Sequence, residues 1–179
     1  MKTIKIIETK EVYSGRVSLR KDKFLMAGKT IEKEIVQHQD SVGVVPIIDK
    51  DIIILVTQYR HAAGKTLLEI PAGKIEQDET PEQAAIREMA EEIGYSGKLE
   101  RLLKWYLAPG YSTEFMHVFT ATNLKKIKRG ILDDDENIRV RKLKITSIVN
   151  KCLEGKINDC KTIAAVLAYR NHHYGSSAL

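Results

Sequence analysis

The stretch GKIEQDETPEQAAIREMAEEIGY, residues 73–95, constrains the fold of this chain more than any other part of its 179 residues. Before it, apolar residues alternate or form short β-branched runs, which is typical of strands; within it, they recur at helical spacing. Thr80 opens the pattern T-P-E-Q, which combines an N-cap, a proline at the first helical position and a capping-box glutamine. Gly94 is a natural terminator. We therefore predict a helix from Pro81 to Ile93.

Strand patterns flank this helix on both sides. Asp49-Lys50-Asp51 predicts a tight hairpin between two runs rich in β-branched residues, which we expect to be central strands. No repeat or low-complexity linker is present, so we predict a single domain over residues 1–179, with antiparallel strands within residues 1–40. The predicted strands lie within residues 11–19, 30–36, 41–48, 51–60, 66–73, 98–110, 114–124 and 138–145. A turn ends the segment 66–73, and a loop at Pro109-Gly110 joins the two strands around it. Two further helices are expected at about residues 147–153 and 161–174.

Three acidic residues lie together on the predicted helix. At about 100° per residue, Glu92 lies about 40° and Glu91 about 60° from Glu88, so the three share one side. The adjacent stripe faces the core and consists of Ala85, Ile86, Met89 and Ile93. The acids are therefore expected at the edge of the buried face rather than opposite it.

Such a cluster is costly unless something positive holds it. Glu88 and Glu92 are like charges at i,i+4, which destabilise a helix by about 0.2–0.5 kcal/mol, and partial burial adds to that cost. Arg87 can pair with Glu91 and neutralises only one carboxylate. A cation that prefers oxygen ligands, such as Mg²⁺, would hold the rest, and no His or Cys joins the cluster to favour zinc. The alternative is a solvated acidic face; the strand end Ile70–Gly73, whose carbonyls could reach the same cation, favours the metal.

Charge and composition favour a small anionic ligand over a nucleic acid or a membrane. The net charge of +5 and the pI near 9.1 attract anions in general. The basic run at residues 125–130 is short, and no dense Lys/Arg tract with interleaved aromatic residues marks a nucleic-acid surface. We expect no membrane span and no signal peptide, because no long apolar run is present. Cys152 and Cys160 do not suggest a disulfide framework, which favours a cytoplasmic protein.

The helix and the loop before it resemble a known signature, the Nudix box. That pattern is a glycine, five residues, a glutamate, seven residues, then Arg-Glu, an apolar residue, any residue, Glu-Glu, any residue, a glycine and an apolar residue. Its fixed positions are filled here by Gly73, Glu79, Arg87, Glu88, Met89, Glu91, Glu92 and Gly94. Tyr95 is the one departure, because the last position is more often aliphatic. A pattern of this length is far more specific than a lone phosphate-loop glycine motif.

Segments outside the box resemble one branch of the family, the ADP-ribose pyrophosphatases. They are QYR at 58–60, LEIPAG at 68–73, APGYSTE at 108–114 and DDDENIRV at 133–140. Pro109 matches the proline that distinguishes this branch. The resemblance covers roughly residues 10–170. It implies an α+β fold of the Nudix type, an α/β/α sandwich with a mixed β-sheet.

The resemblance also implies roles for individual residues. The expected ligands of Mg²⁺, or of Mn²⁺ in its place, are the carboxylates of Glu88, Glu91 and Glu92 and the carbonyl of Ala72. Arg87 and Glu79 would hold the loop and the helix in register, and we include Arg87, Glu91 and Glu92 among the catalytic residues. The branch takes its general base from an acidic loop after the box. Glu136 is the best match, with Asp135 and Asp134 behind it; the alternative for these acids is a solvated loop.

Four residues are expected to contact the substrate: Arg60, Gly73, Pro109 and Glu114. The guanidinium of Arg60 suits phosphate oxygens or the terminal ribose, although a surface arginine at a strand end would look the same in sequence. Gly73 lets the backbone approach closely, and Pro109 and Glu114 lie in a loop that approaches the substrate in this branch. The implied reaction is Mg²⁺-dependent hydrolysis of the pyrophosphate bond of ADP-ribose to AMP and ribose 5-phosphate.

Other functions remain open at this point. A different nucleotide sugar, such as GDP-mannose or ADP-glucose, could be the substrate, or the chain could be a Nudix module that binds a nucleotide without hydrolysis. Nucleic-acid processing is suggested only by the basic pI. Members of the resembled branch are usually homodimers that pack through N-terminal strands, so the segment 1–40 is expected at a dimer interface.

Overall fold

The computed structural model describes residues 4–128, 130 and 137–175. They form two compact units, described separately below. The N-terminal unit combines the chain up to Asp40 with Trp105–Met116, and the main unit combines Ser41–Lys104 with the chain from His117 onward. The expectation of a single domain over residues 1–179 stays a prediction.

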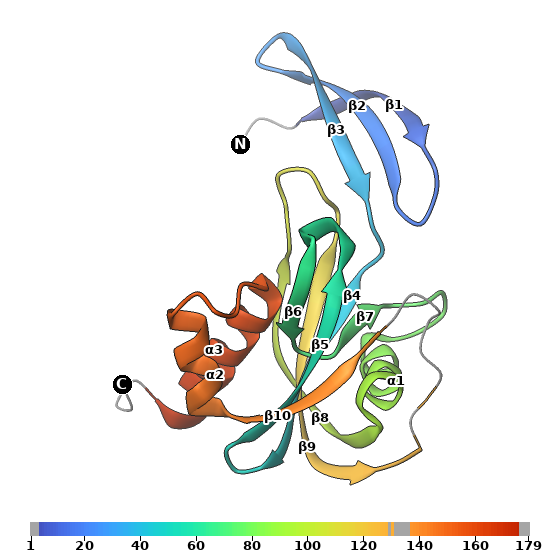
Figure 1. Cartoon of the computed structure of the whole chain (residues 1–179). Coiled ribbons are helices and arrows are strands. Elements are labelled where there is room, and N and C mark those ends of the chain that lie inside the picture. The colour runs from blue at the N-terminus through green and yellow to red at the C-terminus, as the bar shows by residue number, and fades with distance from the viewer. Residues whose placement is uncertain (1–3, 129, 131–136, 176–179) are drawn as a thin grey trace. The chain divides into compact units, whose positions relative to one another are not determined.

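The N-terminal unit contains an antiparallel three-stranded sheet in the order β1-β2-β3. Its strands are β1 (Lys5–Tyr13), β2 (Ser18–Met26) and β3 (Lys29–Gln37), drawn in blue in Figure 1. The antiparallel strands predicted here are confirmed, but the strand predicted at 11–19 is wrong. That run spans the end of β1, a turn and the start of β2, because Ser14-Gly15 breaks an alternation that otherwise continues.

The segment between residues 105 and 116 is fixed to β3 within the same unit. The N–H of Val36 donates to Tyr111 O at 2.7 Å, and the N–H of Thr113 donates to Val36 O at 3.0 Å. The hydroxyl of Thr113 accepts from the N–H of His38 at 2.9 Å. The loop that carries Pro109 is therefore tied to the N-terminal strands by backbone hydrogen bonds.

The described part of the main unit contains a seven-stranded sheet with the central order β10-β5-β4-β9-β8, where β6 pairs with β5 and β7 with β4. The strands are β4 (Ser41–Asp49), β5 (Ile52–Arg60), β6 (Lys65–Glu69), β7 (Ala72–Lys74), β8 (Tyr95–Tyr106), β9 (Phe115–Lys126) and β10 (Arg139–Lys144). The predicted hairpin at residues 49–51 joins β4 to β5, whose buried residues confirm them as central strands. A 3-10 turn at His61–Ala63 connects β5 to β6.

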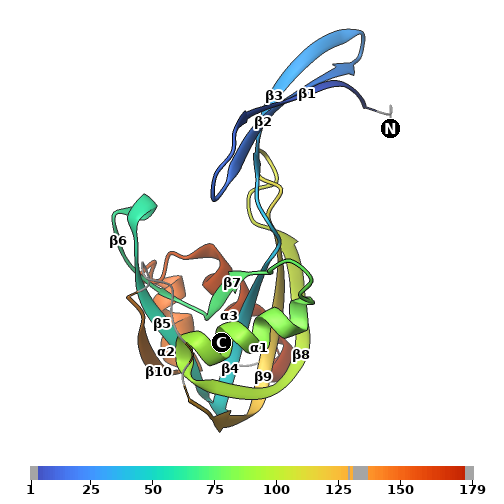
Figure 2. The ribbon, with the colours of Figure 1, turned by 90° about the vertical axis from the view of Figure 1, so that its right-hand side faces the viewer.

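Helices cover both faces of this sheet. Figures 1 and 2 show α1 (Pro81–Ile93) on one face and α2 (Ile145–Leu153) and α3 (Cys160–Tyr174) on the other. The predicted α+β class, a mixed sheet between helices with separate N-terminal antiparallel strands, is confirmed. None of the described helices is long and apolar enough to cross a membrane.

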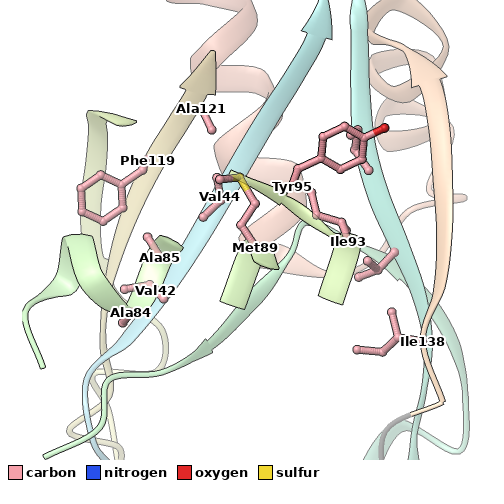
Figure 3. Packing of buried hydrophobic residues seen from close by; sticks show 12 residues of the cluster. Val42, Val44, Ala84, Ala85, Met89, Ile93, Tyr95, Phe119, Ala121 and Ile138 are labelled. Atoms are coloured by element: carbon pink, nitrogen blue, oxygen red, sulfur yellow. The ribbon is translucent and has the colours of Figure 1, made fainter. Parts of the chain in front are cut away.

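The core that positions α1 lies between this helix and strands β4, β5 and β9. Figure 3 shows Met89 directed at the sheet beside Val44, with Phe119 and Tyr95 at the sides. Ala84 and Ala85 are fully buried and have small side chains, so the helix can pack closely on the sheet. Ile86, which we expected in the core stripe, is 43% exposed. The buried arc of the helix is therefore rotated away from Ile86 and toward the acidic residues.

Candidate active site

The acidic helix is built as its sequence predicts. It runs from Pro81 to Ile93 with Thr80 as the N-cap. The Thr80 hydroxyl accepts from the N–H of Gln83 at 3.2 Å, and the Thr80 N–H donates to the side-chain oxygen of Gln83 at 2.8 Å, which is a complete capping box. Gly94 ends the helix in the left-handed conformation, with φ of 70°. The chain between β7 and the C-terminus of α1 is thus fixed by local interactions.

Arg87 donates five hydrogen bonds, three to the segment before the helix and two within the helix. Its Nε and Nη2 donate to the two carboxylate oxygens of Glu79 at 2.9 and 3.0 Å. Nη1 donates to Glu88 at 2.8 Å and to Glu91 at 3.0 Å, and Nη2 also donates to the carbonyl of Lys74 at 2.9 Å. A guanidinium has five N–H groups, and here every one of them has a partner.

This arrangement corrects the expectation that Arg87 neutralises one carboxylate. The predicted pair with Glu91 exists, and Arg87 bonds two further carboxylates. Hydrogen bonding to Glu79 is the largest effect and raises the pKa of Arg87 well above its ordinary value. The same bond lowers the pKa of Glu79. Glu79 is therefore a charged tether between the loop and the helix at neutral pH.

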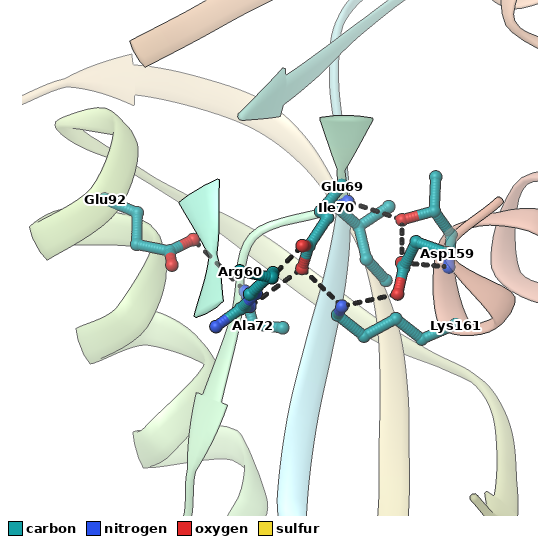
Figure 4. Close-up of polar contacts among 8 residues, drawn as sticks. Arg60, Glu69, Ile70, Ala72, Glu92, Asp159 and Lys161 are labelled. Atoms are coloured by element: carbon teal, nitrogen blue, oxygen red, sulfur yellow. Dashed lines mark hydrogen bonds and ion pairs between the residues drawn. The ribbon is translucent and has the colours of Figure 1, made fainter. Parts of the chain in front are cut away.

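Glu92 lies deeper than the sequence suggested. Its residue is only 2% exposed, and its carboxylate accepts from the N–H of Ala72 at 3.1 Å. On the helix it falls between the buried positions Glu88 and Met89 rather than at the edge of the apolar stripe. Figure 4 shows its carboxylate directed at the strand that carries Ala72. The carboxylate of Glu92 therefore faces β7 instead of solvent.

Gly73 leaves the space that Glu88 occupies. A Cβ atom at residue 73 would lie 1.8 Å from Oε1 of Glu88, which no side chain tolerates without movement. The requirement for glycine at this position is thus steric. This steric requirement explains why a glycine at the end of the strand accompanies a glutamate at position 88 of the helix.

The donor set suits a hard divalent cation such as Mg²⁺. Glu88, Glu91 and Glu92 supply carboxylate oxygens, and Ala72 lies next to Glu92 and supplies a backbone carbonyl, which are the ligand types that Mg²⁺ takes. In the described residues, no three His, Cys, Asp or Glu side chains are grouped as a ready metal cluster. The physical reason is that Arg87 bonds Glu88 and Glu91 while Glu92 turns to the N–H of Ala72.

Arg60, expected as a phosphate contact or a plain surface arginine, is held by a buried carboxylate. Its Nε and Nη2 donate to the two oxygens of Glu69 at 2.9 and 2.7 Å. Lys161 at the start of α3 donates to the same carboxylate, and also to Asp159 at 2.7 Å. Figure 4 shows this set beside Ala72 and Glu92. Our sequence reasoning missed Glu69, Asp159 and Lys161, although a glutamate between apolar residues in LEIPAG already signals a buried charge that needs a partner.

The remaining expected site residues belong to the N-terminal unit or lie outside the described residues. Pro109 and Glu114 belong to the N-terminal unit, where Glu114 lies 3.8 Å from Nδ1 of His38. Glu136 lies outside the described residues, as do Asp134 and Asp135. Gly130, before that segment, donates its N–H to Ala90 O of α1 at 3.2 Å. Arg60, Ala72, Gly73, Arg87 and the three glutamates of α1 are therefore the expected residues that the structure brings together.

Replacing Gly73 with alanine should weaken divalent-cation binding with little loss of stability. The new methyl group displaces the Glu88 carboxylate, which is the end of a flexible side chain and can move at low cost. We expect the Kd for Mn²⁺, measured by titration calorimetry, to rise about 10–100-fold. The Tm should change by no more than about 4 °C.

Gly110→Ala is the matched control, because no described atom lies within 4 Å of its added Cβ. It should leave both the Kd for Mn²⁺ and the Tm as in the parent protein. An unchanged Kd in Gly73→Ala would exclude Glu88 as a metal ligand.

Comparison with known proteins shows the family to which the chain belongs. The model of the NUDIX domain matches residues 37–161. The chain is 37% identical to the "Methanol dehydrogenase activator" of Bacillus methanolicus and 36% identical to the "ADP-ribose pyrophosphatase" of Bacillus subtilis (strain 168), each over 166 residues that cover 90% of both chains. A solved "ADP compounds hydrolase" superposes with a TM-score of 0.87 at 22% identity, covering 100% of this chain and 98% of that one, which shows a shared fold. By this match, and by the filled positions of the Nudix box from Gly73 to Gly94, the chain belongs to the Nudix hydrolase family.

Proposed function

We propose that this Nudix hydrolase cleaves the pyrophosphate bond of ADP-ribose in a reaction that depends on Mg²⁺, giving AMP and ribose 5-phosphate. The observation that carries the proposal is the cluster of Glu88, Glu91 and Glu92 on one side of α1. Glu92 bonds Ala72, Glu88 lies against Gly73, and Arg87 bonds Glu88 and Glu91. Arg87 supplies one positive charge to three acids at this partly buried helix face, and a divalent cation would balance the rest and serve the hydrolysis of a diphosphate.

The proposed ligands of Mg²⁺ are the three carboxylates and the carbonyl of Ala72, and Mn²⁺ should replace it. When bound, the cation supplies positive charge to the diphosphate oxygens and orients the attacked group. Hydrogen bonds from Arg87 hold the carboxylates of Glu88 and Glu91 in position, and the N–H of Ala72 holds that of Glu92. We propose Arg60, Gly73, Pro109 and Glu114 as substrate contacts. Arg60 would offer guanidinium N–H groups to phosphate oxygens.

Two alternatives share these features. GDP-mannose or ADP-glucose has the same diphosphate linkage, and a nucleotide-binding module without hydrolysis would keep the fold. The 36% identity to an ADP-ribose pyrophosphatase along 90% of the chain supports ADP-ribose over the other nucleotide sugars. The complete set of box carboxylates supports hydrolysis over binding alone, because a module without catalysis has no use for so costly a cluster. The two cysteines are free thiols, which supports a cytoplasmic location.

A hydrolysis panel tests the substrate and the metal together. ADP-ribose, ADP-glucose, GDP-mannose, diadenosine polyphosphates and NADH are each incubated with Mg²⁺ or with EDTA, and the products are separated by chromatography. With Mg²⁺, we expect ADP-ribose to be hydrolysed to AMP and ribose 5-phosphate faster than any other substrate in the panel. With EDTA, we expect no hydrolysis. In Glu92→Gln, turnover should fall by at least about 100-fold.

Glu82→Gln is the control, since Glu82 lies on the same helix but bonds the exposed Arg101. It should keep the parent rate. Preferred hydrolysis of another substrate would overturn the assignment to ADP-ribose, and binding without any turnover would favour the non-catalytic module.

Glu136 is proposed as the general base. Glu136→Gln should lower kcat by about 10²–10⁴-fold, because the attacking water loses its proton acceptor. The Kd for Mn²⁺ should stay within about twofold of the parent value, since the ligands on α1 are untouched. An unchanged kcat would move the role to a neighbouring acid, which Asp135→Asn and Asp134→Asn would identify.

A homodimer through the N-terminal strands is proposed as well. This unit exposes large apolar side chains, among them Ile6, Val12 and Tyr13, each at least half exposed. Sedimentation velocity at micromolar concentration should show a dimer, and Ile6→Lys should shift it to a monomer. Ile127→Lys, which changes an exposed isoleucine of the main unit, should remain dimeric. A monomeric parent protein would refute the proposal.

A further inference from the structure

A chain of charged side chains connects Arg60 to the N-terminus of α3. Glu69 is 1% exposed, and its carboxylate accepts a two-point bond from Arg60 and a third bond from Lys161. Lys161 also donates to Oδ1 of Asp159, the N-cap of α3. Burial alone would raise the pKa of Glu69, but bonding to Arg60 and the charge of Lys161 outweigh it, so the pKa is lowered. Glu69 is therefore an ionised carboxylate with two cationic partners.

The same cap fixes the strand segment next to the box. Oδ2 of Asp159 accepts from the N–H of Thr162 at 3.0 Å and from its hydroxyl at 2.5 Å. The Thr162 oxygen in turn accepts from the N–H of Ile70 at 2.8 Å. Pro71 O accepts from the N–H of Val44 at 2.9 Å, and the N–H of Ala72 donates to Glu92. Figure 4 shows that Ile70–Ala72 run from the α3 cap to the acidic helix.

Arg60 keeps donors for an external anion. Glu69 uses Nε and one Nη2 hydrogen, and in the described part of the chain Nη1 has no bond. Its side chain is 39% exposed, and Figure 4 shows it beside Ala72, on the side of the proposed metal site. A free arginine at a strand end would sample many rotamers, whereas this one is held by a fork to a carboxylate that is itself immobilised.

Stability alone does not account for the arrangement. Buried ion pairs often contribute less than apolar side chains of the same size, because both charges must be desolvated. Here Arg60 and Lys161 share the Glu69 carboxylate, and Asp159 is a second anion on Lys161, while Nη1 of Arg60 takes no part in these ion pairs. Such an arrangement is expected where the orientation of a charged head matters.

We infer that Lys161, acting through Glu69, is a positioning residue that orients Arg60 to bind a phosphate group of the substrate. The inference rests on the proposed function insofar as it takes the substrate to be a diphosphate. It adds α3 to the substrate-binding part of the molecule, although no side chain of that helix needs to touch the substrate. Lys161 would control how tightly the diphosphate binds more than how fast it is cleaved.

The test uses inorganic pyrophosphate as the probe, because every candidate substrate contains a diphosphate. Its Kd is measured by titration calorimetry on the full chain, with EDTA and with Mg²⁺. We expect Lys161→Met to weaken binding about tenfold and Lys161→Arg to restore it to within about threefold. Lys161→Gln keeps a hydrogen-bond donor to Glu69 without the positive charge, so its Kd for pyrophosphate should lie between those of Lys161→Met and Lys161→Arg. It serves as the informative variant if Lys161→Met does not fold.

A double-mutant cycle separates positioning from other effects. Arg60→Met should abolish most pyrophosphate binding, and adding Lys161→Met to it should weaken binding no further, because both changes act on one contact. Lys156→Met is the matched control. The Lys156 side chain is 65% exposed and its ammonium pairs with the exposed Glu154, so its effect should stay below about twofold. With ADP-ribose, Lys161→Met should raise KM about tenfold and leave kcat within about threefold.

Three results would overturn the inference: parent-like pyrophosphate binding in Lys161→Met, additive losses in the double variant, or no pyrophosphate binding by the parent protein in either buffer. A failure of the proposed function gives a different pattern. In that case ADP-ribose is not hydrolysed, while pyrophosphate still binds and still depends on Lys161.

Discussion

The hydrogen bonds of Arg87 are the interaction on which the rest of the site depends. One guanidinium joins the loop, through Glu79 and Lys74 O, to two carboxylates of α1. Without it, like charges would crowd a helix face that is packed against a sheet, and the loop after β7 would have no charged tether to the helix. Because the planar fork satisfies several acceptors at fixed angles, a lysine could not replace it.

Two anchors hold the backbone beside that cluster from opposite faces of the sheet. On one face, Glu92 of α1 accepts from the N–H of Ala72. On the other, Thr162 of α3 accepts from the N–H of Ile70. The short segment between them can therefore move little, which is what a backbone carbonyl needs if it is to act as a metal ligand. Gly73 completes this geometry by leaving room for Glu88.

Local sequence signals predicted the elements that local interactions decide. The bounds of α1, its capping box and its terminal glycine were all predicted from residues within one turn of each end. The hairpin between β4 and β5 was predicted for the same reason. The strand predicted at 11–19 failed because an alternating pattern on both sides of Ser14-Gly15 was taken as one strand, whereas the chain turns there from β1 to β2. The predicted burial of Ile86 was wrong because a helical wheel gives the angles between side chains and not the direction in which the sheet lies.

By itself, the sequence determined the family, the acidic helix and the set of carboxylates, because spacing along a helix fixes which side chains share a face. Tertiary structure alone decided how those carboxylates are used: Arg87 bonds Glu79, Glu88 and Glu91, while Glu92 is buried against Ala72. It also decided that Lys161 bonds the carboxylate of Glu69, 92 residues away in sequence, and that the same carboxylate holds Arg60. Contacts at that separation depend on how α3 packs on the sheet, and no local pattern in the chain encodes that packing.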